Sequence, residues 1–192
     1  MHNLHWSFLA AAPFPDSALL GTRLHARLAR DSDMESVYAL GYDVWGEGME
    51  LDQYLLLCKN SAKYKKGTWV VFSEGTKSPP VVALICYRLI GLFDITVIGI
   101  GSVATNSSDR NQSFATEALK LVLDVFDEQY VSQLLVLFPD SKTSVYSNVG
   151  FEFPPLTGAA SRKTCPMYYR TKQGNQKDTD RVVALIHEVP YF

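Results

Sequence analysis

The strongest constraint on the fold is one apolar run, FDITVIGIGSVAT, at residues 93–105. β-branched residues dominate it and few positions are polar, which is typical of a strand covered on both faces. Gly99 and Gly101 inside the run indicate a bulge or a close approach by another backbone. A polar segment follows, and then an amphipathic stretch at 114–126. The run therefore predicts a central strand in a sheet with helices on both sides.

The rest of the chain alternates between strand-like and helix-like patterns. Strands are expected where β-branched and aromatic residues gather, and helices where apolar residues recur three and four positions apart. This order predicts an α/β or α+β fold with helices on both faces of the sheet. The expected strands are 22–29, 68–74, 81–90, 93–105, 132–139, 151–153, 165–171 and 181–189, and the expected helices are 34–45, 49–60, 114–126 and a short one within 141–149.

Capping residues set several of these limits. Asp31 and Asp33 precede the first helix, where a side-chain oxygen can accept hydrogen bonds from free N–H groups. Glycines in WGEGM, at 45–49, separate the first two helices, and Gly150 suits the end of the short helix. Residues 173–180 are expected to form a polar loop before the last strand.

Three parts are expected along the chain: an N-terminal arm at 1–21, a main domain at 22–172, and a C-terminal loop with an extra strand at 173–192. The segment HWSFLAAAPFP, at 5–15, has some features of a signal peptide. No Lys or Arg precedes it and two prolines interrupt it, which a signal peptide does not tolerate well. We therefore expect an arm, packed on the domain or mobile, and a cytoplasmic protein.

Composition excludes several kinds of function. The formal net charge of −2 gives no basic surface for nucleic acid, and no apolar run reaches the roughly 18 residues of a membrane span. The four histidines are scattered and Cys58, Cys86 and Cys165 are far apart, so no metal site is expected. Cys86 lies in a strand-like apolar run and is expected in the core.

The polar segment NSSDRNQS, at 106–113, joins the central strand to the next helix. The first turn of a helix has N–H groups without internal partners and carries partial positive charge, which suits a pyrophosphate. Arg110 would add a cation at the rim of such a site. The alternative is an ordinary polar connection before a capped helix, and spacing alone leaves both interpretations open.

Two motifs resemble those of the GNAT superfamily, the Gcn5-related N-acetyltransferases. RNQSFA, at 110–115, is similar to the family's acetyl-CoA loop, R/Q-x-x-G-x-G/A, between a strand and a helix. YSNVGF, at 146–151, is similar to the Tyr-x-x-x-Gly-Phe that often follows the family's fifth strand. The order of expected elements over about 22–172 also agrees with the family.

The resemblance implies a mixed, mostly antiparallel sheet, acetyl-CoA as co-substrate, and no metal. It implies that the backbone of the central strand pairs with the pantetheine arm, and that the Val103 N–H polarises the thioester carbonyl. Ser113 stands where the family has Gly, and Pro139 where the family has a polar residue. The implied cofactor-binding residues are Ser102, Val103, Thr105, Arg110, Asn111, Gln112, Ser113, Phe114, Ala115 and Tyr146.

The two motifs indicate a candidate general acid but do not identify the general base. Tyr146 occupies the position of the family's general acid, and the alternative is a core tyrosine. Glu47 and Asp94 are candidate bases, and a relay through water is a third possibility. Trp45, with Tyr42 and Tyr54, is expected either to line an acceptor pocket or to close the core.

The sequence therefore predicts an N-acetyltransferase that transfers an acetyl group from acetyl-CoA to a primary amine in a ternary complex. The acceptor would be a small molecule or a protein terminus, with no nucleic acid or membrane partner, and a homodimer is allowed. A non-catalytic acyl-CoA-binding module is the main alternative. A phosphate-binding domain of another kind is a third, but it leaves the motif at 146–151 unexplained.

Overall fold

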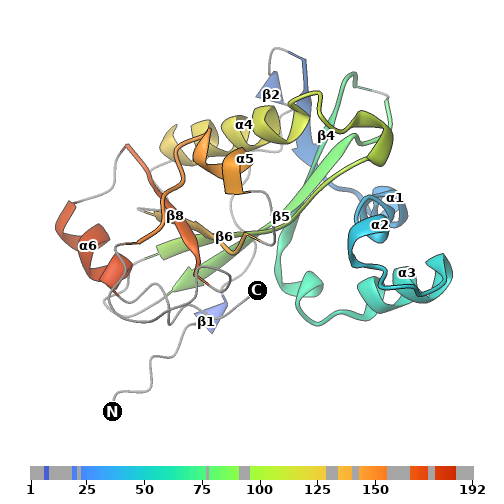
Figure 1. Ribbon diagram of the computed structural model, residues 1–192, viewed down its shortest axis with the longest axis horizontal. Helices are drawn as coiled ribbons and strands as arrows, with labels where there is room; N and C mark the ends of the chain where they lie inside the picture. The colour runs from blue at the N-terminus through green and yellow to red at the C-terminus, as the bar shows by residue number, and fades with distance from the viewer. Residues whose placement is uncertain are drawn as a thin grey trace.

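The computed structural model describes residues 7–8, 19–20, 23–76, 78–90, 96–128, 134–139, 143–154, 165–172 and 176–184. Within them one mixed sheet carries helices on both faces, as the sequence predicted. Figure 1 shows α4 and α5 together above the strands, and α1 to α3 grouped at the right-hand end. No described helix is long and apolar enough to cross a membrane.

The sheet has eight strands, seven of which follow chain order from one edge to the other. All neighbouring pairs are antiparallel except β6 and β7, which run parallel. The short β1, Ser7–Phe8, pairs with β5 beside this path. The other strands are β2 (Leu19–Leu20), β3 (His25–Leu28), β4 (Thr68–Ser73), β5 (Val82–Ile90), β6 (Thr96–Thr105), β7 (Leu134–Leu137) and β8 (Met167–Arg170).

Among the described residues, α3, α4 and α6 are the longer helices, and three single turns of 3-10 helix accompany the others. The α-helices are α1 (Met34–Ala39), α2 (Tyr42–Trp45), α3 (Leu51–Asn60), α4 (Phe114–Glu128), α5 (Thr143–Ser147) and α6 (Gln176–Ala184), and the 3-10 turns are η1 (Asp31–Asp33), η2 (Tyr64–Lys66) and η4 (Ser107–Asp109).

The central strand β6 is covered on both faces, as its apolar run predicted. Ile98 and Ile100 pack into a core with the apolar stripe of α4, which includes Leu119 and Val122. Val97 packs into a second core on the opposite face, which contains side chains of α1. Cys86 is fully buried, and the three cysteines are free thiols in the interior.

A bulge interrupts the pairing of β5 with β6. Ile85 pairs with Gly101 but Ala83 pairs with Ala104, so β6 has one extra residue at this point. Ser102, inside the bulge, has a φ of 47°, in the left-handed region. The bulge predicted from Gly99 and Gly101 is thus confirmed. On its other edge β6 pairs with β7 only from Val97 to Ile100, so the last residues of β6 extend past this pairing.

Three local predictions were wrong. The predicted first helix is divided into α1 and α2 at Leu40 and Gly41. Asp33 does not cap α1 with its side chain, because its carboxylate accepts hydrogen bonds from the Arg30 N–H and the Arg27 guanidinium. The segment 151–153 contributes a single bridge, between Glu152 and Tyr168, and no strand.

The C-terminal prediction was also wrong. The expected polar loop at 173–180 and strand from 181 are replaced by α6, Gln176–Ala184. The Gln176 amide donates to the Asp180 carboxylate one helical turn away, at 2.8 Å, and this pairing supports a helix rather than a loop. The remainder of the predicted strand, from 185, lies outside the described residues.

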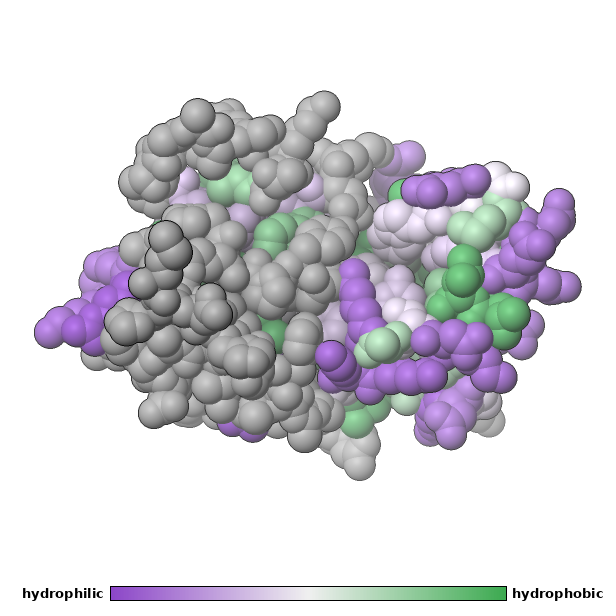
Figure 2. Space-filling view, turned by 90° about the horizontal axis from the view of Figure 1, so that it is seen from below, coloured by the Kyte–Doolittle hydropathy of each residue, from purple (hydrophilic) through white to green (hydrophobic). Residues whose placement is uncertain are grey.

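Exposed large apolar side chains occur on α2 and α3. They are Val44, Leu51, Leu56 and Leu57, of which Leu56 is 59% exposed. Figure 2 shows apolar surface bordered by hydrophilic residues at the right-hand end of the molecule.

Asp127 near the end of α4 is a buried carboxylate that holds the last part of the sheet. Asp127 is 4% exposed. Its carboxylate accepts hydrogen bonds from the Tyr169 hydroxyl at 3.0 Å and the Lys172 N–H at 2.9 Å. We predict that Asp127→Ala lowers the free energy of unfolding by roughly 2–3 kcal/mol, because both donors lose a charged acceptor. Chemical denaturation measures this loss.

Asp124→Ala is the matched control, because Asp124 lies on the same helix but is exposed. Its effect should stay within about 0.5 kcal/mol. Equal stability changes in the two variants would contradict the role given to Asp127.

Candidate functional site

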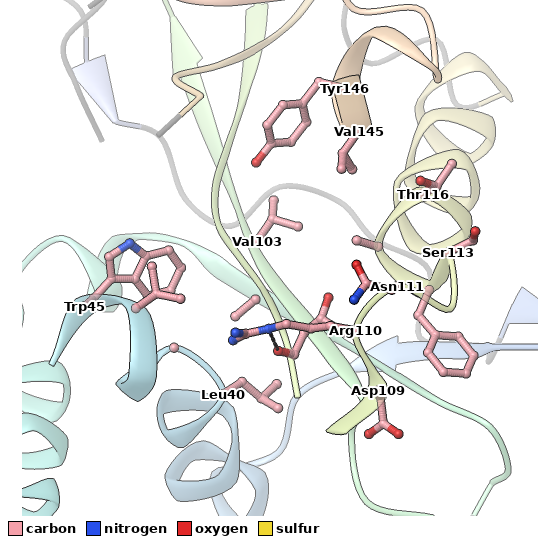
Figure 3. A pocket seen from close by; sticks show the side chains of 16 residues that line it. Leu40, Trp45, Val103, Asp109, Arg110, Asn111, Ser113, Thr116, Val145 and Tyr146 are labelled. Carbon is pink, nitrogen blue, oxygen red and sulfur yellow. Dashed lines mark hydrogen bonds between the residues drawn. The ribbon is translucent and has the colours of Figure 1, made fainter. Parts of the chain in front are cut away.

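A cavity of about 390 Å³ lies beside the end of β6, between α4 and α5 on one side and α1 and α2 on the other (Figure 3). Its position follows from the sheet, because β6 continues past its pairing with β7 and leaves room at that edge. The described lining residues are Leu40, Gly41, Val44, Trp45, Val103, Ala104, Thr105, Asp109, Arg110, Asn111, Ser113, Phe114, Ala115, Thr116, Val145 and Tyr146.

The loop before α4 adopts a tight backbone that turns toward this cavity. Asn111 and Ser113 have φ values of 63° and 66°, which non-glycine residues rarely adopt. The helical ladder starts when the Glu117 N–H donates to the Ser113 carbonyl, at 3.0 Å. The N–H groups of the first turn therefore have no acceptor within the helix, and this end of α4 borders the cavity. The geometry suits an anion.

Arg110 lines the cavity, and its guanidinium is paired with the carboxylate of Asp43. Its Nη2 donates to Asp43 Oδ1 at 2.7 Å, and its Nη1 lies 2.6 Å from Asp43 Oδ2. Its Nε donates to the Thr105 carbonyl at 3.2 Å. The hydrogen bonds between the two side chains raise the pKa of Arg110 and lower the pKa of Asp43. A bidentate pair thus connects the loop to α2.

Arg23, just before β3, makes hydrogen bonds to the start of α4 and to the loop before it. Its backbone N–H donates to Glu117 Oε1 at 2.8 Å, and its Nη1 donates to the Gln112 carbonyl at 3.2 Å. Its guanidinium lies 4.4 Å from the centre of the Phe114 ring, which is 1% exposed. Phe114 therefore borders the cavity while its ring belongs to the core, and Gln112 is not among the described lining residues.

Ser102 also lies outside the lining set, although Val103 and Thr105 belong to it. The Ser102 hydroxyl donates to the Tyr64 hydroxyl at 3.2 Å. The Tyr64 ring stacks on Tyr38, with centroids 5.8 Å apart. Because Tyr64 packs with the core on the α1 face, Ser102 is directed to that face, while Val103 packs with the α4 core.

Tyr146 lies at the opposite end of the cavity from the loop. Its ring packs edge-on against Phe151, with centroids 6.4 Å apart. Figure 3 shows its hydroxyl directed toward the side of the cavity occupied by Val103 and Trp45. Gly150 ends this helical segment with a φ of 98°, as predicted. The ring is therefore packed while the hydroxyl faces the cavity.

The remaining wall comes from α1 and α2. Trp45 lies on Gly41 so closely that a Cβ at residue 41 would come within 2.2 Å of the indole. Tyr42 and Tyr54, expected beside it, are not among the described lining residues. Their rings contact each other, with centroids 5.5 Å apart, and the Tyr42 hydroxyl donates to the Met49 carbonyl. Trp45 alone of the three borders the cavity.

The two candidate bases are not brought to the cavity by any described contact. Glu47 is exposed, has a φ of 47° in the turn after α2, and is not a lining residue. Asp94 lies outside the described residues. Asp109 is the one carboxylate among the described lining residues. The described part of the chain contains no group of three or more potential metal ligands.

Comparison with known proteins identifies the architecture. No family model matches the sequence, and no curated protein is similar to it. Solved structures do match. The GNAT family N-acetyltransferase YhbS of Escherichia coli, in complex with CoA, superposes with a TM-score of 0.57 at 16% identity, over 82% of this chain and 85% of that one. This chain has the GNAT fold.

Two further solved structures also match this chain. The acetyltransferase of Agrobacterium tumefaciens str. C58 matches with a TM-score of 0.57 at 15% identity, over 83% of this chain and 98% of that one. The NatC complex bound to Gag peptide and CoA matches at 0.53 and 11% identity, over 78% of this chain and 99% of its matched chain.

Within this GNAT fold, sequence reasoning pointed to Trp45 on α2 but missed the other residues that the α1–α2 segment brings to the site. Leu40, Gly41 and Val44 line the cavity, and Asp43 holds Arg110, but the chain separates Asp43 from Arg110 by 67 positions. An isolated aspartate in a short helix carries no sequence signal of such a partner.

Ser113 generates the first prediction of the site. A non-glycine residue in the left-handed region destabilises the folded state by about 1–2 kcal/mol. Glycine removes this strain, but its greater backbone entropy stabilises the unfolded chain by about 0.4–1 kcal/mol. We predict that Ser113→Gly raises the free energy of unfolding by about 0.5–1 kcal/mol. Ser113→Ala, which keeps the backbone cost, is the control, and urea denaturation of both variants is the measurement. A glycine variant no more stable than the alanine variant would count against strain at Ser113.

Proposed function

We propose that this cavity binds acetyl-CoA and that the protein is an N-acetyltransferase. The observation that carries the proposal is the placement of one cavity between the first turn of α4 and the hydroxyl of Tyr146, along the free end of β6. The fold is shared with a GNAT family N-acetyltransferase in complex with CoA and with the NatC complex bound to CoA. The positive φ angles at Asn111 and Ser113 allow the loop backbone to surround a pyrophosphate.

In this proposal, the loop at 110–115 and the N-terminus of α4 hold the pyrophosphate, because their N–H groups and the helix dipole favour negative charge. The backbone of β6 beyond Ile100 offers hydrogen-bonding groups to the pantetheine arm. The Val103 N–H stabilises negative charge that develops on the thioester oxygen during attack by an amine. Tyr146 donates a proton to the departing thiolate, since a phenol is a proton donor near neutral pH.

The acceptor would approach along the α2 wall, formed by Val44 and Trp45, which it would share with the pantetheine end of CoA. Residues 31–58 contain seven Asp and Glu residues and no Lys or Arg. Asp33 and Asp43 are paired with Arg27 and Arg110, and the other carboxylates attract a positively charged amine, which must lose a proton before it attacks. Asp109 is the one carboxylate among the described lining residues, so the cavity wall offers few side-chain bases. We therefore propose that water carries this proton from the amine to the solvent. The acceptor is a primary amine of a small molecule or a protein terminus.

A second candidate function is a non-catalytic acyl-CoA-binding module. Ser113 in place of a loop glycine and the scarcity of carboxylates in the cavity wall favour this alternative. A screen of amines with acetyl-CoA, followed by release of free thiol, separates the two. Thiol release that depends on the amine supports the enzyme, while CoA binding without release supports the module.

The cofactor proposal predicts stabilisation by CoA. A ligand that binds only the folded protein raises the free energy of unfolding by mass action, by roughly 2.7 kcal/mol at 100 times its dissociation constant, and so raises the melting temperature. Acetyl-CoA and desulfo-CoA should both raise the Tm, because both carry the phosphates that the loop would bind. Differential scanning fluorimetry measures this shift. No shift and no heat of binding at millimolar CoA would refute the proposed cofactor.

The catalytic proposal predicts a specific loss in Tyr146→Phe. This variant keeps the ring that packs on Phe151 and removes the hydroxyl, so kcat should fall by about 10²–10⁴-fold, with little change in CoA affinity or Tm. Tyr38→Phe is the control, because Tyr38 is a half-buried tyrosine that is not a described lining residue. Turnover at the wild-type rate in Tyr146→Phe would leave Tyr146 with a packing role alone.

A further inference from the structure

The four-residue helix α2 is held only in part by packing, through Trp45 against Gly41 and Tyr42 against Tyr54. None of its residues is buried, and Val44 is 57% exposed. Gly41 and Gly46 flank the helix, and so short a helix is not stable by its own hydrogen bonds. Its position therefore depends on contacts with other parts of the chain. Two of its residues, Val44 and Trp45, nevertheless form a wall of the cavity.

The ion pair between Asp43 and Arg110 supplies such a contact. Two parallel contacts join the side chains, at 2.7 Å and 2.6 Å. The Nε of Arg110 donates a third hydrogen bond, to the Thr105 carbonyl at 3.2 Å. A bidentate arginine–carboxylate pair fixes orientation as well as distance. One guanidinium thus connects α2, the end of β6 and the loop before α4.

The direction of Arg110 matters for what this pair does. In Figure 3 its side chain extends from the loop toward Leu40 and Trp45, away from the helix that carries Thr116. Its guanidinium is therefore directed at α2 and not at the first turn of α4. The loop and the α2 wall are held at a fixed separation on either side of the cavity.

We propose that Asp43 is a positioning residue of the cofactor site, which holds Arg110 so that the α2 wall and the pyrophosphate loop form one preorganised cavity. The inference rests on the proposed binding of CoA. A ligand that contacts both the loop and the α2 wall gains from this preorganisation, because the wall is ordered before binding. A ligand that contacts only the loop gains nothing from it.

A competing role for the same pair gives the opposite result. If Arg110 leaves Asp43 and binds the pyrophosphate directly, Asp43 competes with the ligand. Removal of the Asp43 charge then strengthens binding of every ligand that carries the pyrophosphate. The sign of the effect on affinity, and its dependence on the pantetheine arm, separate positioning from competition.

The test uses the full chain and isothermal titration calorimetry with two ligands. One is CoA, and the other is adenosine 3′-phosphate 5′-diphosphate, which keeps both phosphates of the pyrophosphate but lacks pantetheine. The variants are Asp43→Asn, Arg110→Gln and the double variant. Asp52→Asn is the control, because it removes one negative charge from an exposed position on α3. Melting temperatures show that each variant is folded.

We expect Asp43→Asn to weaken CoA binding about three- to fivefold, the scale of a partly exposed ion pair. Binding of the truncated nucleotide should not change, and neither ligand should respond to Asp52→Asn. The double variant should bind CoA no more weakly than Arg110→Gln alone, because both changes break the same pair.

Tighter binding of both ligands to Asp43→Asn would overturn the inference in favour of competition. Unchanged CoA affinity in Asp43→Asn would also overturn it, and additive losses in the double variant would show that the two residues act separately. A wild-type protein that binds no CoA would instead refute the proposed function, which is a distinguishable outcome.

Discussion

The site depends on where β6 stops pairing with β7. The parallel pairing ends at Ile100, while β6 continues to Thr105, and the bulge at Ser102 changes its register with β5 on the other edge. A strand end with backbone groups available at one edge is a place where a ligand can take over strand-like hydrogen bonds. The loop before α4, the short α5 and the α1–α2 segment are all arranged around this opening.

Two kinds of interaction define the walls of the opening. The wall formed by the loop before α4 is set by backbone conformation, because Asn111 and Ser113 adopt left-handed φ angles there. On the other side, a pair of side chains distant in the sequence, Arg110 and Asp43, holds α2. The two sides differ in sensitivity to solvent conditions, because salt screens the exposed ion pair and leaves the backbone geometry unchanged.

Much of the fold could be predicted from the sequence, because the apolar run at 93–105 and the stripe of α4 have strong periodicity. The loop and Tyr146, which border the cavity, were singled out because they lie in short contiguous motifs. Asp43 and Gly41 were missed, since their roles come from partners distant in the chain. The helix α6 was misread as loop and strand, because Val182 and Val183 favour a strand locally while the polar residues before them pair at helical spacing.

The sheet also has a consequence for how the chain folds as it is made. From β2 to β8 the strands occupy the sheet in the order of their synthesis, so each new strand adds to an edge that is already present. The edge of β6 waits longer for its partner, because β7 begins only at Leu134, after the whole of α4 has been made. Until then a long apolar edge is open to other chains, which is the circumstance in which sheets associate wrongly. Docking of α4 covers one face of β6 and leaves this edge open, so the edge is protected only when β7 itself pairs with β6.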